Sequence, residues 1–192
     1  MRIIAGKWRG RLLEPLYREP GQRSALHKTL RPTSDKVRGA IFNILEHGDF
    51  PPLDGARVLD AFCGSGALGF EALSRGAAFA LFLDESSAAL KLAKENAGSL
   101  KAEKFCAFEM RDLSKPQTGR REAFNFIFLD PPYRKDLAAN ALRHLHKGGF
   151  IAENAVAVVE TAKQEAFEAP PGWRLLGRRS WGDTAASFLI HE

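Results

Sequence analysis

Apolar residues follow two periods along most of this chain. From residue 53 onward, short runs rich in β-branched and aromatic residues alternate with segments whose apolar residues recur every three or four positions. Such alternation predicts parallel strands joined by helices, and therefore an α/β sheet that carries helices on both faces. The predicted strands span about 56–61, 79–84, 104–109, 124–130 and 155–160, and the predicted helices span about 67–75, 86–97 and 136–147.

A further helix is predicted before this region, over residues 35–47. Ser34 is a suitable N-cap, and Gly48, followed by two prolines, ends the helix. The apolar residues fall at i, i+3, i+4, i+7 and i+8, which places them in one buried stripe. The stripe consists of Val37, Ala40, Ile41, Ile44 and Leu45.

The two ends of the chain show other patterns. Residues 173–181 and 184–191 predict a hairpin that turns at Gly182-Asp183, so we expect an antiparallel strand at the end of the sheet. Residues 3–14 predict two short strands around residues 7–10. Residues 15–33 are rich in Pro, Gly and basic groups, and predict a mobile loop.

Composition limits the class of protein. With 192 residues, 45% of them hydrophobic, the chain is long enough for one sizeable core. No apolar run approaches the roughly 20 residues of a membrane span, and the early basic residues are unlike a secretory signal. Cys63 and Cys106 make neither a disulfide framework nor a metal site. We therefore expect a soluble cytoplasmic protein without a metal, in which Cys63 is a packing residue.

Charge is concentrated at the N-terminus. The net charge is +5, but residues 1–40 contain ten Lys or Arg and three acids, so this part carries +7 and the rest −2. A basic segment on a near-neutral body is typical of polyanion binding, although a solubilising surface has the same composition. Trp8 and Tyr17 lie among the basic residues and favour nucleic acid, because aromatic faces stack on bases.

A glycine turn follows the first predicted strand. Gly64, Gly66 and Gly69 match G-x-G-x-x-G between a strand and a helix. Asp84 ends the next strand, 20 residues after Gly64, where an acid can bind ribose hydroxyls. The pattern therefore predicts a site for a ligand that contains ribose.

The acids around this turn favour S-adenosylmethionine over a dinucleotide. Asp60 immediately precedes the turn, where it would repel a pyrophosphate but accept from an ammonium group. Asp112 follows the third strand and is placed to reach an adenine edge; the alternative is a solvated turn residue. S-adenosylmethionine has a ribose, an amino group and a sulfonium, and no phosphate.

The tetrapeptide Asp130-Pro131-Pro132-Tyr133 follows another strand. Two prolines stiffen the backbone and remove two N–H donors, so the segment is extended and presents carbonyls, a carboxylate and an aromatic face. That set suits a planar group that carries an amino substituent. A strand-ending Asp-Pro turn is the alternative.

Together, these motifs resemble the class I S-adenosylmethionine-dependent methyltransferases of exocyclic amino groups. Residues 2–11, 30–38 and 62–72 are similar to the RsmD family, the bacterial 16S rRNA guanine-N2 methyltransferases, and the likeness extends to residues 181–184. The resemblance implies a Rossmann-like seven-strand sheet, mostly parallel with an antiparallel C-terminal strand, after a short N-terminal β-hairpin or basic extension. We expect residues 1–33 to form an RNA-binding extension and residues 34–192 the methyltransferase domain.

The resemblance also implies roles for residues. It implies that S-adenosylmethionine, and its product S-adenosylhomocysteine, contact a cofactor set: Asp60, Phe62, Gly64, Ser65, Gly66, Asp84, Glu85, Asp112 and Leu113. It implies that Asp130 and the Pro131 carbonyl hold guanine N2, with Pro132 in the same loop and Tyr133 stacked on the extruded base. The proton then leaves to Asp130 or to water.

The basic segment is expected to hold 16S rRNA, within an assembling small ribosomal subunit, as a monomer. The expected RNA contacts are Arg2, Lys7, Trp8, Arg9, Arg11, Arg31, Thr33, Lys36 and Arg38. Residues 31–33 can instead form a wall of the cofactor pocket.

Three features depart from the family. Phe82 occupies a position where relatives often have Glu, Tyr133 replaces a Phe, and residues 15–29 have no obvious counterpart. Other functions remain open: an adenine-N6 methyltransferase of DNA or RNA, a non-catalytic RNA-binding Rossmann protein, and a nucleotide-dependent oxidoreductase, which Asp60 disfavours.

Overall fold

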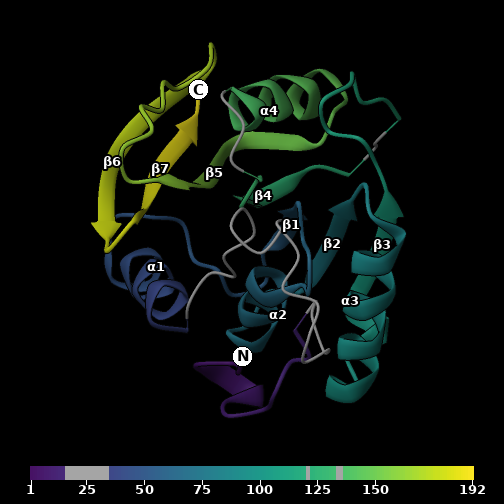
Figure 1. Ribbon diagram of the computed structural model, residues 1–192. Helices are drawn as coiled ribbons and strands as arrows, with labels where there is room; N and C mark the ends of the chain where they lie inside the picture. The colour runs from purple at the N-terminus through teal and green to yellow at the C-terminus, as the bar shows by residue number, and fades with distance from the viewer. Residues whose placement is uncertain (16–34, 120–121, 133–135) are drawn as a thin grey trace.

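One seven-stranded sheet organises the molecule (Figure 1). This computed structural model describes residues 1–15, 35–119, 122–132 and 136–192. The strand order is β3-β2-β1-β4-β5-β7-β6. The first five strands pair in parallel, and β7 pairs antiparallel with both of its neighbours, so the predicted fold class is confirmed. The strands are β1 (Arg57–Ala61), β2 (Phe79–Asp84), β3 (Cys106–Met110), β4 (Phe124–Leu129), β5 (Ile151–Ala162), β6 (Trp173–Trp181) and β7 (Thr184–His191).

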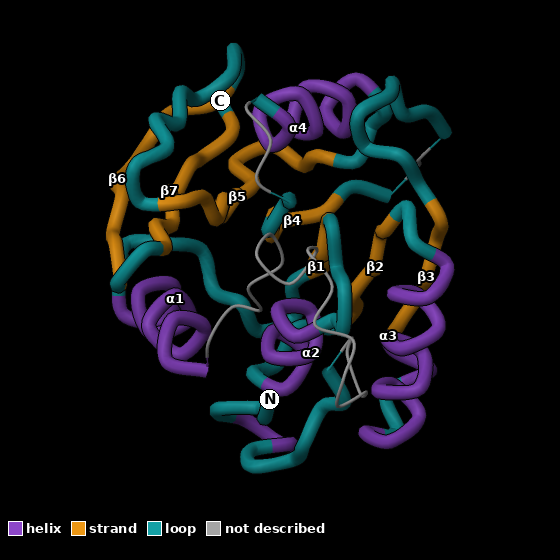
Figure 2. Tube along the Cα trace, viewed as in Figure 1, coloured by secondary structure: helices purple, strands orange, loops and turns teal. Residues whose placement is uncertain are grey.

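Helices cover both faces of the sheet, as the alternating pattern predicted (Figure 2). Successive strand residues point to opposite faces, so each strand supplies two separate clusters of buried residues. Val58, Phe82 and Phe126 face α1 (Asp35–His47), α2 (Ala67–Ser74) and α3 (Ser87–Leu100). Leu59 and Ile127 face α4 (Leu137–Lys147) on the other side.

Most predicted boundaries agree with the structure to within a few residues, and two strands differ for local reasons. Strand β3 starts at Cys106 because Glu103–Phe105 form a 3-10 helix before it. Strand β5 starts earlier than predicted, at Ile151, with a register shift against Phe124/Phe126. Asn154 has a φ of 56°, and the polar residues around it hid this irregular start from the pattern.

The N-terminal segment is not the pair of strands that we predicted. It contains one isolated antiparallel bridge, between Arg2 and Leu12, around the 3-10 helix η1 (Gly6–Trp8). Ile3 and Leu13 are buried in the cluster on the α1–α3 face. Residues 1–15 are therefore packed on the body of the protein, while a domain division at residue 33 stays a prediction.

The predicted loop from residue 16 onward and the proposed N-cap Ser34 lie outside the described residues. In the part of the chain that the structure describes, no helix is both long and apolar enough to cross a bilayer.

Candidate active site

The chain reverses its direction of travel across the sheet between β1 and β4. It runs outward from β1 to β3 and then returns to β4 on the other side of β1. In open α/β sheets, ligands bind beyond the carboxyl ends of the strands at such a point. Asp60 pairs in register with Phe82 of β2 and Phe128 of β4. Asp84 and Asp130 lie two residues further along these strands, so all three carboxylates share one face.

Asp60 is a buried acid with other acids nearby. It is 2% exposed, and its Oδ2 accepts a hydrogen bond of 2.8 Å from the Gly69 backbone N–H. Burial raises the pKa of Asp60 well above its usual value, the Gly69 hydrogen bond opposes this shift, and the charges of Asp130 and Asp84 raise the pKa further. These three acids are close enough for the charges of two of them to act on the third. The structure therefore brings together residues that the sequence analysis assigned to the cofactor and to the acceptor.

The glycine turn packs tightly on one side and is open on the other. A Cβ on Gly69 would lie 2.4 Å from the Phe82 ring, and one on Gly66 would lie 2.5 Å from the Phe70 ring. A Cβ on Gly64 would meet no atom within 4 Å. Gly66 and Gly69 therefore allow the turn to pack on β2 and α2, and Gly64 leaves room for a ligand.

Asp84 connects the glycine turn to the loop after β2. Its Oδ2 accepts from the Gly64 N–H at 3.0 Å, and its Oδ1 accepts from the Ser86 N–H at 2.8 Å. A carboxylate oxygen has two lone pairs, so each oxygen can accept a further hydrogen bond. Asp84 can thus order both loops and still bind hydroxyl groups.

Phe82, a departure from the expected family pattern, is a core residue here. It is fully buried, and its ring centroid lies 5.0 Å from Phe108 and 4.6 Å from Phe70. A role in binding ribose is therefore left to the next acids along the chain, Asp84 and Glu85.

Asp112 forms a local turn. Its Oδ1 accepts from the Ser114 N–H at 3.0 Å and from the Ser114 hydroxyl at 2.5 Å, and Lys115 Nζ lies 2.9 Å from Oδ2. The hydrogen bonds from Ser114 and Lys115 lower the pKa of Asp112 to about 2. The hydrogen bond and the charge of Asp112 raise the pKa of Lys115, and the charge of Glu85 raises it further. Glu85 therefore lies near this turn. The turn is the alternative that the sequence left open, and an adenine contact stays a prediction.

The remaining residues of the expected cofactor set lie around the turn, most of them with buried side chains. Leu113 is 2% exposed in the cluster that faces α4, so its side chain packs in the core. Phe62 is half-buried and has a φ of 63°. Ser65 is buried, and its carbonyl accepts from Asn96 Nδ2 at 3.0 Å.

Cys63, within the glycine turn, is buried. Burial raises the pKa of its thiol, and the charges of Asp60 and Asp84 raise it further, as suits a packing residue.

The loop of residues 130–132 borders a cavity. Asp130, Pro131 and Pro132 are half-buried, and Tyr133 lies outside the described residues. A cavity of about 680 Å³ lies against Pro131 and Pro132, and the end of β5 and the start of α4 form other walls. Local sequence patterns do not indicate this cavity, because its walls come from segments far apart in the chain.

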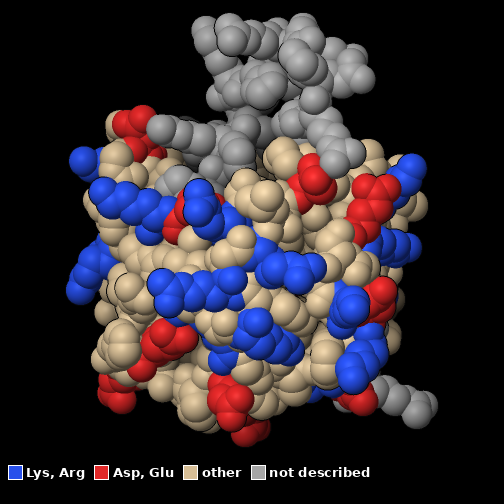
Figure 3. Space-filling view, turned by 90° about the horizontal axis from the view of Figure 1, so that it is seen from below, with Lys and Arg blue, Asp and Glu red and all other residues tan. Residues whose placement is uncertain are grey.

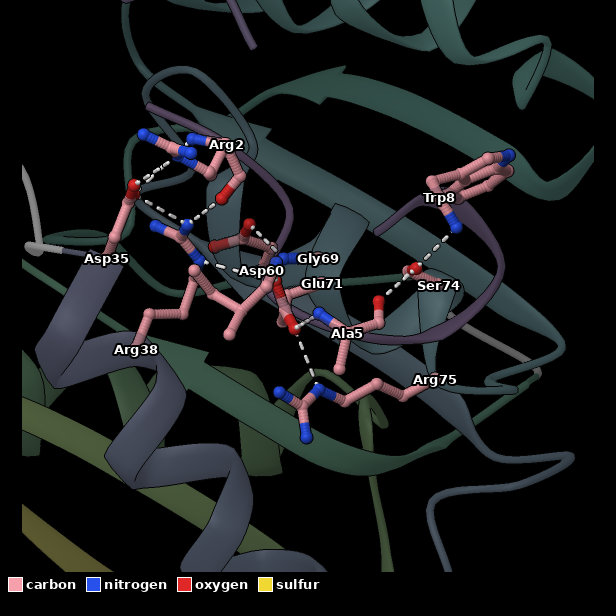
Figure 4. A network of polar contacts seen from close by, with 11 residues as sticks. Arg2, Ala5, Trp8, Asp35, Arg38, Asp60, Gly69, Glu71, Ser74 and Arg75 are labelled. Atoms are coloured by element: carbon pink, nitrogen blue, oxygen red, sulfur yellow. Dashed lines mark hydrogen bonds and ion pairs between the residues drawn. The ribbon is translucent and has the colours of Figure 1, made fainter. Parts of the chain in front are cut away.

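The N-terminal segment is attached to α2 through Glu71, a residue that the motifs did not single out (Figure 4). Glu71 is fully buried and accepts hydrogen bonds from the Ile4 N–H at 2.8 Å and the Ala5 N–H at 3.1 Å. Arg75 Nε donates to it at 2.7 Å, and Arg38 Nε lies 3.5 Å away. The sequence could not indicate this role, since an acid in an apolar helix has no distinctive pattern.

Arg38 was expected to touch RNA, and the structure corrects this expectation. Its side chain is fully buried, donates to the Arg2 carbonyl and pairs with Asp35 at 3.0 Å. It pairs with the buried Glu71 and the half-exposed Asp35, and its own side chain is not on the surface.

Other basic residues are on the surface, in a basic groove that we define by Lys7, Trp8, Arg11, Lys101, Lys104 and Phe105. Figure 3, seen from below, shows Lys and Arg gathered across one face of the molecule. Lys7 Nζ lies 4.2 Å from the centroid of Trp8 and 4.6 Å from that of Phe105. Lys101 and Lys104 follow α3, and the sequence did not indicate them because only folding brings them to the N-terminal segment.

The other expected RNA contacts are partly visible. Arg2, Arg9 and Lys36 are exposed, and the Arg2 side chain lies 3.7 Å from Asp35. Arg31 and Thr33 lie outside the described residues, so the two roles proposed for residues 31–33 stay predictions.

The strand order, the terminal antiparallel strand and the acids at the strand ends define a Rossmann-like methyltransferase. Among solved structures, the Escherichia coli protein yhhF matches with a TM-score of 0.79 and 32% identity, covering 100% of this chain and 98% of that one. The chain belongs to the family described as Conserved hypothetical protein 95, whose model matches residues 1–190. Together with relatives named Ribosomal RNA small subunit methyltransferase D, this match confirms the resemblance to the RsmD family.

Named relatives cover the whole chain. The Haemophilus influenzae protein named Ribosomal RNA small subunit methyltransferase D is 37% identical over 197 residues, which is 100% of this chain and 93% of that protein. The Escherichia coli protein of the same name is 36% identical over 194 residues, at 100% and 90% coverage.

The residues at the sheet edge fit S-adenosylmethionine. A buried acid surrounded by other acids, an open space above Gly64 and an acid that orders two loops suit an ammonium group and ribose hydroxyls. Within the described ranges, no three His, Cys, Asp or Glu side chains are grouped to hold a metal ion.

Proposed function

We propose that this protein transfers a methyl group from S-adenosylmethionine to the exocyclic N2 of a guanine in small-subunit rRNA. The observation that carries the proposal is the shared face of Asp60, Asp84 and Asp130 at the reversal between β1 and β4. It combines a site for a cationic nucleoside with an acceptor loop next to it. The relatives, which are named for methylation of small-subunit rRNA, support the choice of substrate.

The cofactor lies over the first strands in this proposal. Asp60 accepts from the amino group, Asp84 and Glu85 accept from the ribose hydroxyls, and the backbone of residues 62–66 lines the site. Asp112 and the backbone of Leu113 border the adenine. When bound, the cofactor supplies a methyl group activated by a sulfonium.

The acceptor loop positions the base. Asp130 and the Pro131 carbonyl accept hydrogen bonds from the N2 amino hydrogens, and Tyr133 stacks on the base, with Pro132 fixing the loop. As the N2 lone pair forms the new N–C bond and the C–S bond breaks, Asp130 stabilises the positive charge that develops on N2. The N2 proton then passes to Asp130 or to water.

The surface that faces the rRNA backbone includes the N-terminal segment. Arg2, Lys7, Trp8, Arg9, Arg11 and Lys36 are its proposed contacts, extended by Lys101 and Lys104 of the basic groove, with Arg31 and Thr33 as further predictions. Arg38 is excluded because it is buried. We place the reaction in the cytoplasm, on an assembling small subunit, with the protein acting as a monomer and without a metal.

The test is to map methylation in rRNA. Small-subunit rRNA from cells that lack the protein is incubated with the protein and labelled S-adenosylmethionine, digested and analysed for methylated nucleosides. N2-methylguanosine at one position is expected. Label on adenine N6, or label that appears only when duplex DNA replaces the rRNA in a parallel reaction, would overturn the proposal in favour of an adenine methyltransferase. No label, and no thermal stabilisation by S-adenosylhomocysteine, would favour a non-catalytic RNA-binding protein.

A further inference from the structure

The cavity beside the acceptor loop has a distinct position in the sheet. Strand β4 lies between β1 and β5, so the glycine turn after β1 and the end of β5 flank the Asp130 loop on opposite sides. The cavity, of about 680 Å³, is on the β5 side and is lined by Pro131, Pro132, Glu160 and Thr161. It therefore lies on the β5 side of the Asp130 loop, away from the glycine turn.

Glu160 lies level with Asp130 in the neighbouring strand. Leu129 pairs in register with Val159, so the next residues, Asp130 and Glu160, come side by side as β4 ends. Val158 of β5 and Phe128 of β4 both face the α1–α3 cluster, and alternation places Glu160 and Asp130 on that same face. Neighbouring strands lie about 4.8 Å apart, which is close enough for two carboxylates to contact one base.

The end of β5 is held rigidly. Arg178 Nη2 donates to the Thr161 hydroxyl and the Ala162 carbonyl at 3.2 Å each, and to the Glu165 carbonyl at 2.7 Å. Glu160 itself is 3% exposed. A buried acid on a strand end with fixed backbone is preorganised for recognition by hydrogen bonds.

The described part of the cavity wall includes several acids. Among the lining residues that the structure describes, the acids Asp136, Glu160, Glu165 and Glu168 outnumber the one cation, Arg143. A carboxylate accepts hydrogen bonds, so Glu160 suits an edge that carries N–H donors. A purine Watson–Crick edge with adjacent N–H groups meets this requirement.

We propose that Glu160 accepts a hydrogen bond from N1–H of the target guanine and so selects guanine over adenine, an inference that rests on the proposed function. Guanine presents N1–H beside its N2 amino group. Glu160 accepts from N1–H, and the neighbouring Asp130 accepts from the amino group. Adenine presents an N1 lone pair beside its N6 amino group, and this lone pair would face the Glu160 carboxylate. A site that hydrogen-bonds a donor rejects the analogue that lacks it.

The experiment uses 2-aminopurine, which keeps the amino group at C2 but has no N1–H. Small-subunit rRNA is ligated around a synthetic segment in which the mapped guanine is either kept or replaced by 2-aminopurine. The kcat/KM for methyl transfer is measured on both RNAs with the wild type and with Glu160→Gln. The matched control is Glu153→Gln, an exposed acid near the other end of β5.

We expect Glu160→Gln to lower the ratio of guanine to 2-aminopurine kcat/KM by roughly ten- to hundredfold, because the amide is a weaker acceptor for N1–H and can donate to N1 of 2-aminopurine. Glu153→Gln leaves the ratio at the wild-type value. An unchanged ratio in Glu160→Gln overturns the inference while the proposed function stands. Absence of transfer to guanine by the wild type overturns both.

A second variant covers a folding defect, which a shift in thermal unfolding would reveal. Glu160→Asp keeps the charge and shortens the side chain, so it is expected to lower the rate on guanine more than the rate on 2-aminopurine. Equal losses on the two RNAs would contradict the inference.

Discussion

Of two buried carboxylates, one lies on helix α2 and the other accepts a hydrogen bond from it, and their surroundings are opposite in charge. Glu71, which is fully buried, is met by two backbone N–H groups and two arginines, Arg38 and Arg75. Asp60, which is 2% exposed, accepts a hydrogen bond from the Gly69 N–H. Burial raises its pKa, and the charges of Asp130 and Asp84 raise it further. The first acid joins the N-terminal segment to α2, and the second lies at the proposed cofactor site.

The difference separates a structural carboxylate from one that we propose to be functional. A buried charge is tolerated when opposite charges and donors compensate the lost hydration. Glu71 meets this condition within the chain. Asp60 meets it poorly, and its pKa is raised. Local compromises of this kind are typical of functional sites, and a cationic ligand would complete the missing compensation.

The largest expected effect concerns Glu71. In Glu71→Gln the ion pairs with Arg38 and Arg75 are removed while both cations remain buried, so the free energy of unfolding should fall by about 3–5 kcal/mol. Urea unfolding measures it. Glu122→Gln is the control, since Glu122 pairs with Arg57 at 2.6 Å but is 69% exposed, and a loss below about 1 kcal/mol is expected. Equal losses would show that Glu71 is no more structural than a surface acid.

The next effect concerns catalysis by Asp130. Asp130→Ala should lower kcat for rRNA methylation roughly hundred- to thousandfold, because the charge developing on N2 loses its acceptor. The affinity for S-adenosylhomocysteine, measured by calorimetry, should stay near the wild-type value. Asp49→Ala, an exposed acid after α1, is the control with unchanged kinetics. A parallel loss of cofactor affinity would move Asp130 to the cofactor site.

Asp60→Asn should separate stability from binding. The neutral amide avoids the burial of a charge, so the variant is expected to be more stable than the wild type near neutral pH. Its affinity for S-adenosylhomocysteine should fall roughly ten- to hundredfold, because the ligand's ammonium group loses a charged partner. Thermal unfolding and calorimetry test the two effects. A variant that loses stability would place Asp60 with Glu71 as a structural acid.

The pH dependence gives Asp60 a second test. Because its folded pKa is raised, the native state keeps a proton that the unfolded chain releases above its ordinary pKa of about 3.9. This contribution makes wild-type stability fall as pH rises from the unfolded to the folded pKa. Asp60→Asn should flatten that fall, and its gain in stability should increase with pH over the same window. A constant difference between the two proteins would contradict the raised pKa.

The smallest effect concerns the exposed arginines, in contrast to the buried Arg38. Changing Arg9 and Arg11 to Gln should reduce the slope of log affinity for rRNA against log salt by about 0.7 for each phosphate that the protein no longer neutralises. Binding at several salt concentrations measures the slope. Arg174→Gln, on β6 beside Glu192, should leave it unchanged. If the slope of the double variant equals the wild-type slope, the segment only adds solubility.

Local patterns predicted the fold well, because strand and helix periods are written into neighbouring residues. They also located Asp60, Asp84 and Asp130, since parallel strands bring their carboxyl ends to one edge. They failed where distant segments meet. The pairing of Glu71 with the N-terminal segment spans more than 60 residues, and the groove brings Lys7 to Lys104. The segment's backbone was mispredicted because its shape depends on docking against α2.

Gly6 sets the position of the N-terminal segment on the body. A Cβ at this residue would lie 1.8 Å from the Ser74 carbonyl oxygen, so only glycine permits the approach. Eight residues later, the Glu14 N–H donates to Asn96, which in turn donates to the carbonyl of Ser65 in the glycine turn. Hydrogen bonds through Asn96 therefore connect the basic segment to the glycine turn. In the proposed function, an RNA strand held at Arg9 and Arg11 would present its base at a set distance from these arginines, so the spacing between phosphates and target would itself contribute to selection.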